Sequence, residues 1–364
     1  MNILHLYKDY FPVLGGIENH LKVVAEVQAK AGHQVTVLVC DPGFRTRIEN
    51  LNGVQIIKAG RITTKASMPL SLAQPLALAR IKPDIVHIQS PYPLGETANW
   101  LLRHGRVTVI SYQSDIVKQR TILRFYGPIL RWVLQAADGI ITNNPRYLES
   151  SIWLQPVRQK CRVIPIGIDL SRFRSTNSDS ANPFRLLFVG RLRYYKGLDT
   201  LLHALTQTPQ THLTVVGIGP MQAEWQALSL ALGLGDRVNF TGEIDDAHLP
   251  DFYAQADAFV LPSNARSEAY GIVLLEAMAS GLPCITTELG TGTSWIVQDG
   301  VTGLVVPPAD PLALAQAINR LVHNESLRRQ MGQAALARVR TEFSQEIMVN
   351  RIMQLYEELL ATKR

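Results

Sequence analysis

The chain has 364 residues, of which 46% are hydrophobic, and this length predicts two domains rather than one. The 36 Lys and Arg residues against 30 Asp and Glu give a net charge of +6, which suits a polyanionic ligand and an anionic membrane surface about equally. Three scattered cysteines, with no Cys-x-x-Cys pair, argue against a disulfide framework or a zinc knuckle and fit a reducing cytosol.

The N-terminal segment predicts a buried strand rather than an export leader. It lacks a basic leader followed by a long apolar stretch, so no secretion is expected. No run of about 18 apolar residues occurs anywhere, which argues against a spanning helix. We therefore expect a cytoplasmic protein whose contact with a membrane is at most peripheral.

Short β-rich runs alternate with helix-length segments in the first half of the chain. This alternation predicts a parallel sheet covered on both faces, with residues 16–31 as the first crossover helix. The expected strands are 3–6, 35–39, 54–57, 85–88, 107–110, 140–142 and 163–165.

A polar stretch at 174–183 predicts a linker, after which the same pattern restarts. The expected domains are 1–174 and 175–344, with an amphipathic helix at 345–364 that packs back on the first domain. The expected strands of the second domain are 185–189, 213–216, 238–240, 258–261, 283–286 and 303–305. Two doubly wound, Rossmann-like sheets in tandem predict a ligand in a cleft outside the carboxyl ends of their strands.

Two cations follow the strand 185–189 directly. Gly190 and Arg191 lie at the turn, and Lys196 and Gly197 precede the next helix. Cations at the carboxyl edge of a sheet lie where a diphosphate would bind. Taken alone, the pair is about equally compatible with an ordinary charged surface loop.

A second segment combines two carboxylates with a helix start. Glu268 precedes a helix expected at 271–279, whose first N–H groups form an anion site, and Glu276 lies about one and a half turns inside it. The two carboxylates can reach different hydroxyls of one extended ligand. Ordinary helix-start and helix-surface glutamates are the alternative, although the apolar flanks of Glu276 predict burial. Fixed cations for a diphosphate and carboxylates for hydroxyls together indicate a sugar-nucleotide site.

Further candidates follow other strands. Gly15 and Gly16 allow close backbone approach to a phosphate or sugar, with a plain tight turn as the alternative. Gln113 follows the strand 107–110 and is expected to face the sugar, and Thr241 is expected to border a nucleobase. Gly217-x-Gly219 resembles part of a dinucleotide motif, but Pro220 and the missing third glycine favour a structural turn.

The segment after Gln113 mixes basic and apolar residues. Lys118, Arg120, Arg124 and Arg131 alternate with Ile122, Leu123, Phe125, Ile129, Leu130 and Trp132. This composition fits an anionic bilayer surface. Core packing with cations that reach back to solvent is an equally good interpretation.

These motifs, in this order, resemble the retaining glycosyltransferases of family 4 with the GT-B fold, and the resemblance covers essentially the whole chain. The matching pieces are Gly15-Gly16, Gly190-Arg191 with Lys196-Gly197, Glu268 with Glu276, and Val163-Ile-Pro-Ile-Gly-Ile-Asp169. Within the family, the segments 114–119 and 290–294 look most like bacterial mannosyl- or rhamnosyltransferases of surface-polysaccharide assembly. The resemblance implies transfer of a hexose, with mannose from GDP-mannose as the expected donor, to a glycan or lipid-linked acceptor.

The resemblance also implies roles for single residues. Arg191 and Lys196 would hold the diphosphate, which Gly16 approaches from the first domain, while Glu276 would bind the ribose and Glu268 the transferred sugar. The implied catalytic residues are Glu268, Arg191, Lys196 and Gln113, and the implied donor-binding residues are Gly15, Gly16, Gly190, Arg191, Lys196, Thr241, Glu268, Tyr270, Gly271, Ile272, Val273 and Glu276. No cofactor, metal or nucleic acid partner is implied, and the absence of any Asp-x-Asp triplet agrees with metal independence.

Gln113 departs from the family pattern, which usually has a histidine at this position. A glutamine can bind a sugar hydroxyl, but it cannot carry a positive charge or transfer a proton. A UDP-sugar-dependent transferase and a catalytically weak sugar-nucleotide-binding partner protein therefore stay open as alternatives. A nicotinamide-dependent oxidoreductase and an exported two-lobed solute-binding protein are less favoured, the latter because no leader is present.

Overall fold

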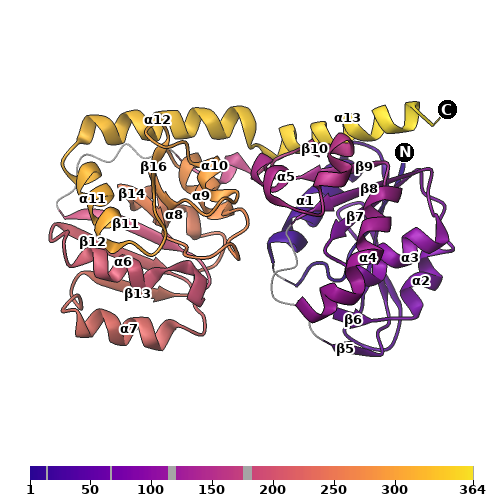
Figure 1. Ribbon diagram of the computed structural model, residues 1–364, viewed down its shortest axis with the longest axis horizontal. Helices are drawn as coiled ribbons and strands as arrows, with labels where there is room; N and C mark the ends of the chain where they lie inside the picture. Colours follow the sequence, from indigo (N-terminus) through magenta and orange to yellow (C-terminus); the bar gives the residue numbers. More distant parts are fainter. Residues whose placement is uncertain (14, 66–67, 114–119, 175–182, 364) are drawn as a thin grey trace. The chain divides into compact units, whose positions relative to one another are not determined.

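The structure, a computed structural model, describes residues 1–13, 15–65, 68–113, 120–174 and 183–363 and divides into two compact units (Figure 1). Unit 1 comprises 1–166 and 345–364, and unit 2 comprises 167–344. The boundary lies at 166/167 rather than at the expected 174/175, because Ile168 forms a bridge to Ser344 and Arg172 donates to the carbonyl of Asp246, both in unit 2. Most of the expected linker, 175–182, lies outside the described residues.

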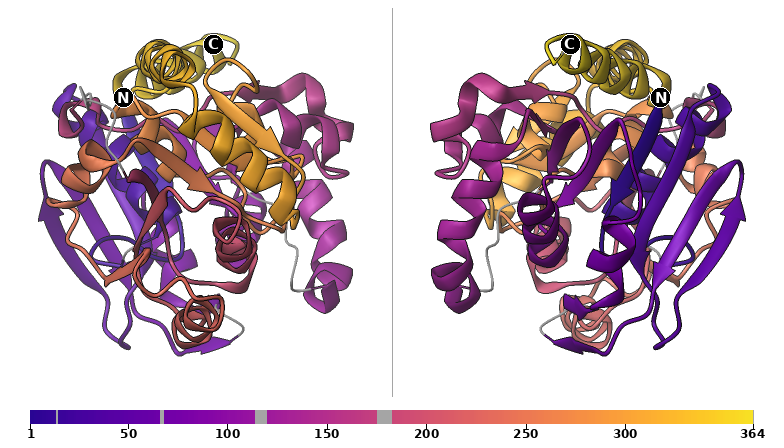
Figure 2. Two further views of the ribbon diagram at one scale, coloured as in Figure 1. Left: turned by 90° about the vertical axis from the view of Figure 1, so that its left-hand side faces the viewer. Right: turned by 90° about the vertical axis from the view of Figure 1, so that its right-hand side faces the viewer.

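The described strands of unit 1 form an eight-stranded sheet of order β10-β9-β8-β7-β1-β2-β4-β3, and a separate pair, β5-β6. All pairs in the large sheet are parallel except β3-β4. The strands are β1 (Asn2–Leu6), β2 (Gln34–Cys40), β3 (Arg47–Leu51), β4 (Val54–Ala59), β5 (Thr63–Lys65), β6 (Met68–Leu70), β7 (Ile85–Ser90), β8 (Val107–Tyr112), β9 (Gly139–Thr142) and β10 (Cys161–Val163). Figure 2 shows the indigo to violet strands of this sheet side by side.

Crossover helices connect these strands, as a parallel sheet requires. The helices of unit 1 are α1 (Gly16–Lys30), α2 (Ala73–Leu78), α3 (Pro93–Leu102), α4 (Arg120–Ala136), α5 (Pro145–Ser150) and α13 (Gln345–Ala361), with a 3-10 segment at Gln155–Lys160. The C-terminal helix α13 packs on α1 and on the sheet. The hydroxyl of Tyr356 in α13 lies 2.6 Å from His87 Nδ1 in β7, and a Cβ on Gly139 would come within 2.8 Å of Leu359.

In unit 2 the described strands form a parallel six-stranded sheet of order β13-β12-β11-β14-β15-β16. The strands are β11 (Phe184–Val189), β12 (Thr211–Val216), β13 (Val238–Gly242), β14 (Ala258–Leu261), β15 (Cys284–Thr287) and β16 (Gly303–Val306). The helices are α6 (Leu198–Leu205), α7 (Gln222–Ala231), α8 (Leu249–Gln255), α9 (Ile272–Ala279), α10 (Thr293–Ile296), α11 (Pro311–Val322) and α12 (Glu325–Glu342), with 3-10 turns at Leu170–Arg172 and Tyr194–Lys196. The strand order reverses between β11 and β14, and this switch point positions the candidate site.

The α/β alternation expected from the sequence is confirmed in both units. The strand expected at 163–165 lies two residues earlier, where β10 covers Cys161–Val163. Strands β3, β5 and β6 were not expected, since β3 and β5 are short and largely polar and β6 is a three-residue segment centred on Pro69. Over the part of the chain that the structure describes, no helix has the length and apolar character needed to cross a bilayer. All three cysteines are buried and free.

Candidate functional site

The loop after β11 is shaped by two glycines with positive φ. Gly190 has a φ of +155° and Gly197 a φ of +68°. A Cβ on Gly190 would lie 3.1 Å from Lys196 Nζ, and a Cβ on Gly197 would lie 2.0 Å from the carbonyl oxygen of Pro262. The loop thus passes tightly against the end of β14 and brings the lysine ammonium under the backbone of Gly190.

Lys196 and Glu268, two residues singled out from the sequence, contact each other. Lys196 Nζ lies 2.7 Å from Glu268 Oε2, and the two side chains are only 10% and 11% exposed. Ser263 Oγ donates to the same carboxylate oxygen at 3.4 Å. The contact arises because β11 and β14 are neighbours in the sheet, so the loops after them meet at one edge.

Arg191 differs from Lys196 in its surroundings. Its side chain is exposed at the same strand end, and no ion pair involves it among the described residues. An exposed guanidinium beside a buried ion pair is available to a phosphate that approaches from solvent.

The segment after Glu268 ends in a helix N-terminus. Gly271 caps α9 with a φ of +86° and without a side-chain hydrogen bond, so the first N–H groups, including those of Ile272 and Val273, lack intrahelical partners. Tyr270 is buried, and Gly292 N donates to the carbonyl of Ala269 at 2.9 Å, which ties the loop 290–292 to this segment. Such a terminus can hold an anion.

Glu276 lies within α9 and has a partner that the sequence did not reveal. The hydroxyl of Tyr253 in α8 donates to Glu276 Oε2 at 2.7 Å. Burial raises the pKa of the Glu276 carboxyl, while the Tyr253 hydrogen bond and the charge of Arg172 oppose this rise. No sequence motif marks Tyr253 or Arg172, because only the packing of α8 and of the 3-10 turn at Leu170–Arg172 brings them near α9.

The remaining candidates of unit 2 border this loop. Thr241 is half-buried at the end of β13, and its hydroxyl donates to the carbonyl of Val215 at 3.3 Å. A Cβ on Gly217 would lie 2.3 Å from the carbonyl oxygen of Gly190, and one on Gly219 would lie 2.4 Å from that of Leu192. The Gly217-x-Gly219 turn therefore packs against the loop after β11, which explains its glycines without a dinucleotide.

The candidates of unit 1 lie at the start of α1, after the loop that follows β1, and directly after β8. Gly15 caps α1 with an extended backbone, and Gly16 is its exposed first residue. Gln113 is buried after β8, where its Nε2 donates to Gln89 Oε1 at 2.9 Å and its carbonyl oxygen accepts from Asn143 Nδ2 at 3.4 Å. The expected segment 114–119 lies outside the described residues, as do the side chains of 120–125.

Two doubly wound α/β units in one chain, with a basic loop and a helix N-terminus at the strand ends of the second, are the architecture of the GT-B glycosyltransferases. The chain belongs to glycosyltransferase family 4. The family described as Glycosyltransferase Family 4 matches residues 14–172, and the family described as Glycosyl transferases group 1 matches residues 171–338.

Relatives of known name agree with this assignment. The chain is 34% identical to O-antigen chain mannosyltransferase C of Escherichia coli over 100% of both chains. It is 36% identical to the D-rhamnosyltransferase WbpZ of Pseudomonas aeruginosa, over 94% of this chain and 92% of the relative. Among solved structures, sucrose-phosphate synthase from Thermosynechococcus elongatus matches with a TM-score of 0.80 and 27% identity, over 99% of each chain. Anabaena HepE in complex with UDP has the same fold, with a TM-score of 0.78 and 22% identity over 98% of this chain and 100% of that one.

Proposed function

We propose that this glycosyltransferase transfers mannose from GDP-mannose to a hydroxyl of a lipid-linked oligosaccharide in surface-polysaccharide assembly, with retention at the anomeric carbon. The names of the E. coli mannosyltransferase and the P. aeruginosa rhamnosyltransferase support the sugar class and the process. The observation that carries the proposal is the buried Lys196–Glu268 pair beside the exposed Arg191. In this pair, the ammonium of Lys196 can bind a phosphate while the adjacent carboxylate of Glu268 accepts a hydrogen bond from a sugar hydroxyl.

The proposed reaction breaks the bond between the anomeric carbon and the diphosphate oxygen and forms one from that carbon to the acceptor oxygen. Arg191, Lys196 and the N–H groups of α9 stabilise the charge that develops on the leaving diphosphate. The departing phosphate oxygen takes the proton of the acceptor hydroxyl, so no enzymic nucleophile is assigned. Glu268 orients the transferred sugar and Glu276 binds the ribose hydroxyls.

The proposal includes independence of a divalent metal, because two cations and a helix terminus supply the counter-charge that a metal supplies elsewhere. Turnover should persist in excess EDTA. Loss of activity with EDTA and its recovery with Mg²⁺ would contradict this part of the proposal.

A thermal-shift panel of GDP-mannose, other GDP-sugars and UDP-sugars tests the donor, since a ligand of the native state raises the unfolding midpoint by mass action. GDP-mannose should give the largest shift, and NMR of the product should show the anomeric configuration of the donor.

Arg191→Ala should lower turnover about a hundredfold without changing the fold, as expected for loss of one charge-stabilising group. Arg193→Ala is the matched control, because Arg193 is also exposed in this loop.

Two alternatives have their own outcomes. A larger shift with UDP-sugars than with GDP-sugars would assign a UDP-sugar donor. Donor binding without turnover or donor hydrolysis would identify a sugar-nucleotide-binding partner protein. This alternative is motivated by Gln113, which occupies the position of the family's usual histidine and hydrogen-bonds to Gln89 and Asn143.

We further propose peripheral contact with an anionic membrane through an apolar surface of unit 1. Large side chains are exposed on neighbouring segments: Phe44 by 82%, Ile62 by 58% and Leu72 by 71%. These segments are joined, because Arg61 N donates to the carbonyl of Gly43 and Ile62 N to that of Leu70. Arg45 and Arg61 flank the apolar side chains and suit anionic lipid headgroups, whereas the neighbouring Arg47 lies 3.6 Å from Asp41 Oδ2 in an ion pair.

Vesicle flotation tests this contact. The double variant Phe44→Ser with Leu72→Ser should reduce binding to vesicles of anionic lipid, while Leu230→Ser, an equally exposed leucine of unit 2, should not. Equal binding of all three proteins would exclude this surface as the contact.

A further inference from the structure

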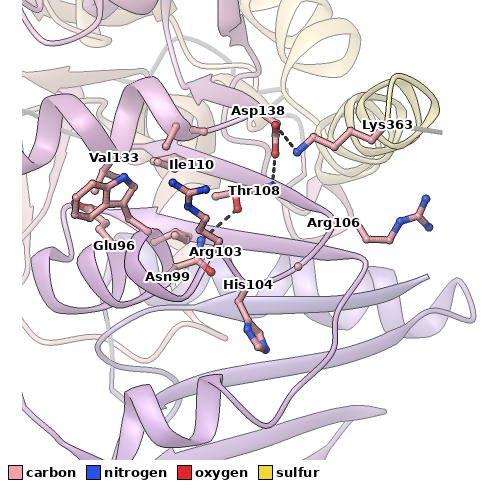
Figure 3. A pocket seen from close by; sticks show the side chains of 15 residues that line it. Glu96, Asn99, Arg103, His104, Arg106, Thr108, Ile110, Val133, Asp138 and Lys363 are labelled. Carbon is pink, nitrogen blue, oxygen red and sulfur yellow. Dashed lines mark hydrogen bonds and ion pairs between the residues drawn. The ribbon is translucent and has the colours of Figure 1, made fainter.

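A pocket of about 290 Å³ opens in unit 1 where β8 and β9 begin (Figure 3). Its walls come from α3, α4, the residues before both strands, and Lys363 beyond α13. Gln113 follows the opposite end of β8, which at about 3.3 Å per residue places it roughly 20 Å from the start of the strand and roughly 10 Å from Ile110, the pocket residue nearest to it along β8. The pocket is therefore distinct from the candidate site at the carboxyl ends of the strands.

A buried amide in this pocket lacks a partner. Asn99 is 3% exposed, its Nδ2 donates to Thr108 Oγ1 at 3.2 Å, and its Oδ1 has no hydrogen-bond partner among the residues that the structure describes. Leaving a buried polar atom without a hydrogen bond is destabilising, so a ligand that pairs with it gains affinity. A hydroxyl both donates and accepts and matches this amide, whereas a phosphate or carboxylate has no proton to donate.

The charges around the pocket are mostly compensated. Lys363 Nζ lies 2.8 Å from Asp138 Oδ1, and Arg106 Nη1 lies 3.6 Å from Asp84 Oδ1. Figure 3 shows Arg103 near Asn99 and Thr108, and no described ion pair involves this arginine. One guanidinium among paired charges favours a neutral ligand with several hydroxyls over a polyanion.

An aromatic surface adjoins the polar pocket. The rings of Trp100 and Trp132 stack with centroids 5.7 Å apart and an angle of 19°, and Trp132 is 52% exposed. Both rings line a shallow depression that shares Trp100 and Ala136 with the pocket. A pyranose ring has a face of C–H groups that can pack on an indole ring. The hydroxyls at its edge can form hydrogen bonds with polar groups of the pocket.

We infer that the pocket and the Trp100–Trp132 surface together form a second, non-catalytic saccharide site. A sugar ring packs on Trp132 while the next unit places hydroxyls on Asn99 and Arg103. The site holds a distal part of the glycan to which sugars are added, which raises the effective concentration of a long acceptor at the enzyme. The choice of a mannose-containing glycan rests on the proposed function, whereas the existence of the saccharide site does not.

Calorimetry and tryptophan fluorescence of the full chain without donor test the inference, with mannobiose, longer α-mannooligosaccharides and α-linked oligosaccharides of rhamnose and glucose as probes. At least one series should bind with saturation. Trp132→Ala and Arg103→Gly should each weaken binding about tenfold, as expected for loss of one stacking or charged hydrogen-bonding partner. Glycine suits position 103 because Arg103 has a φ of +46°. Leu101→Ala is the matched control, since Leu101 is 67% exposed on the same helix but does not line the pocket.

Turnover gives a second measurement. In Trp132→Ala, the KM for a long acceptor should rise while kcat and the KM for a short acceptor stay unchanged. No saccharide binding at millimolar concentration, or binding equal in wild type and both variants, would overturn the inference. Binding of inorganic phosphate or anionic vesicles that Trp132→Ala abolishes, without saccharide binding, would do so as well. Saccharide binding in a chain that never turns over a donor would leave the saccharide site standing and refute only the proposed function.

Discussion

The Lys196–Glu268 contact has consequences for stability as well as for binding. Removal of one partner leaves the other charge buried and unpaired, which typically costs about 3–5 kcal/mol. When both residues are replaced by neutral ones, no buried charge is left unpaired and that cost does not arise. Stability and turnover can therefore be separated at this pair.

Lys196→Met should lower the free energy of unfolding by about 3–5 kcal/mol, measured in urea, because Glu268 loses its partner. It should also lower kcat by about 10²–10³, because the diphosphate loses one charge-stabilising donor. Lys196→Met combined with Glu268→Gln should regain most of the stability but not the activity. Recovery of turnover in the double variant would contradict the role of Lys196 in binding the leaving group.

Gly197 offers a test of the loop geometry. Gly197→Ala should destabilise the fold by more than about 2 kcal/mol, because about 1–2 kcal/mol of left-handed strain adds to a clash with the carbonyl of Pro262. Gly233→Ala is the matched control, since Gly233 has a φ of +69° but no atom within 4 Å of the added Cβ. Its cost should stay within the strain alone, about 1–2 kcal/mol in urea unfolding. Equal losses in the two variants would show that the loop relaxes around the methyl group.

At the scale of elements, the sequence predicts the strands of both sheets, apart from the exposed β3 and the displaced β10, because their buried runs are mostly apolar. β7 is an example, with every residue from Ile85 to Ser90 buried. Its interior His87 and Gln89 show the limit of the pattern, because their burial depends on partners from distant elements. The sequence did not predict the contact of Tyr253 with Glu276 for the same reason. The two residues are 23 positions apart in the sequence and lie on different helices.

Helix α13 is joined to strand β7 of the same unit through one such buried contact. Tyr356→Phe removes the hydroxyl that lies 2.6 Å from His87 Nδ1 and leaves the buried ring nitrogen unpaired. The free energy of unfolding should fall by about 1–3 kcal/mol. Arg351→Gln on the exposed face of α13 should change it by less than about 0.5 kcal/mol. A Tyr356→Phe variant as stable as the wild type would show that His87 finds another partner.

At the scale of the whole molecule, buried histidines link folding to pH. Burial lowers the pKa of His5 and of His20 from 6.5 to about 4, and it also lowers that of His87. Below pH 6.5 the unfolded chain binds protons that the folded chain does not bind until about pH 4. The histidines therefore stabilise the fold above this window, and their contribution is lost as the pH falls through it. Burial raises the pKa of Glu18 and Glu96, and these carboxyls act in the opposite direction.

A histidine variant separates these opposing contributions. For His20 alone, linkage predicts a loss of about 2 kcal/mol of stability between pH 7 and pH 5. His20→Gln should remove that part of the pH dependence, and His20 is suited to the test because its Nδ1 makes no hydrogen bond within the described part of the chain. His212→Gln is the matched control, because His212 is exposed in unit 2. Urea unfolding of the three proteins at both pH values measures the difference, and an unchanged slope in His20→Gln would show that water reaches this ring in the native state.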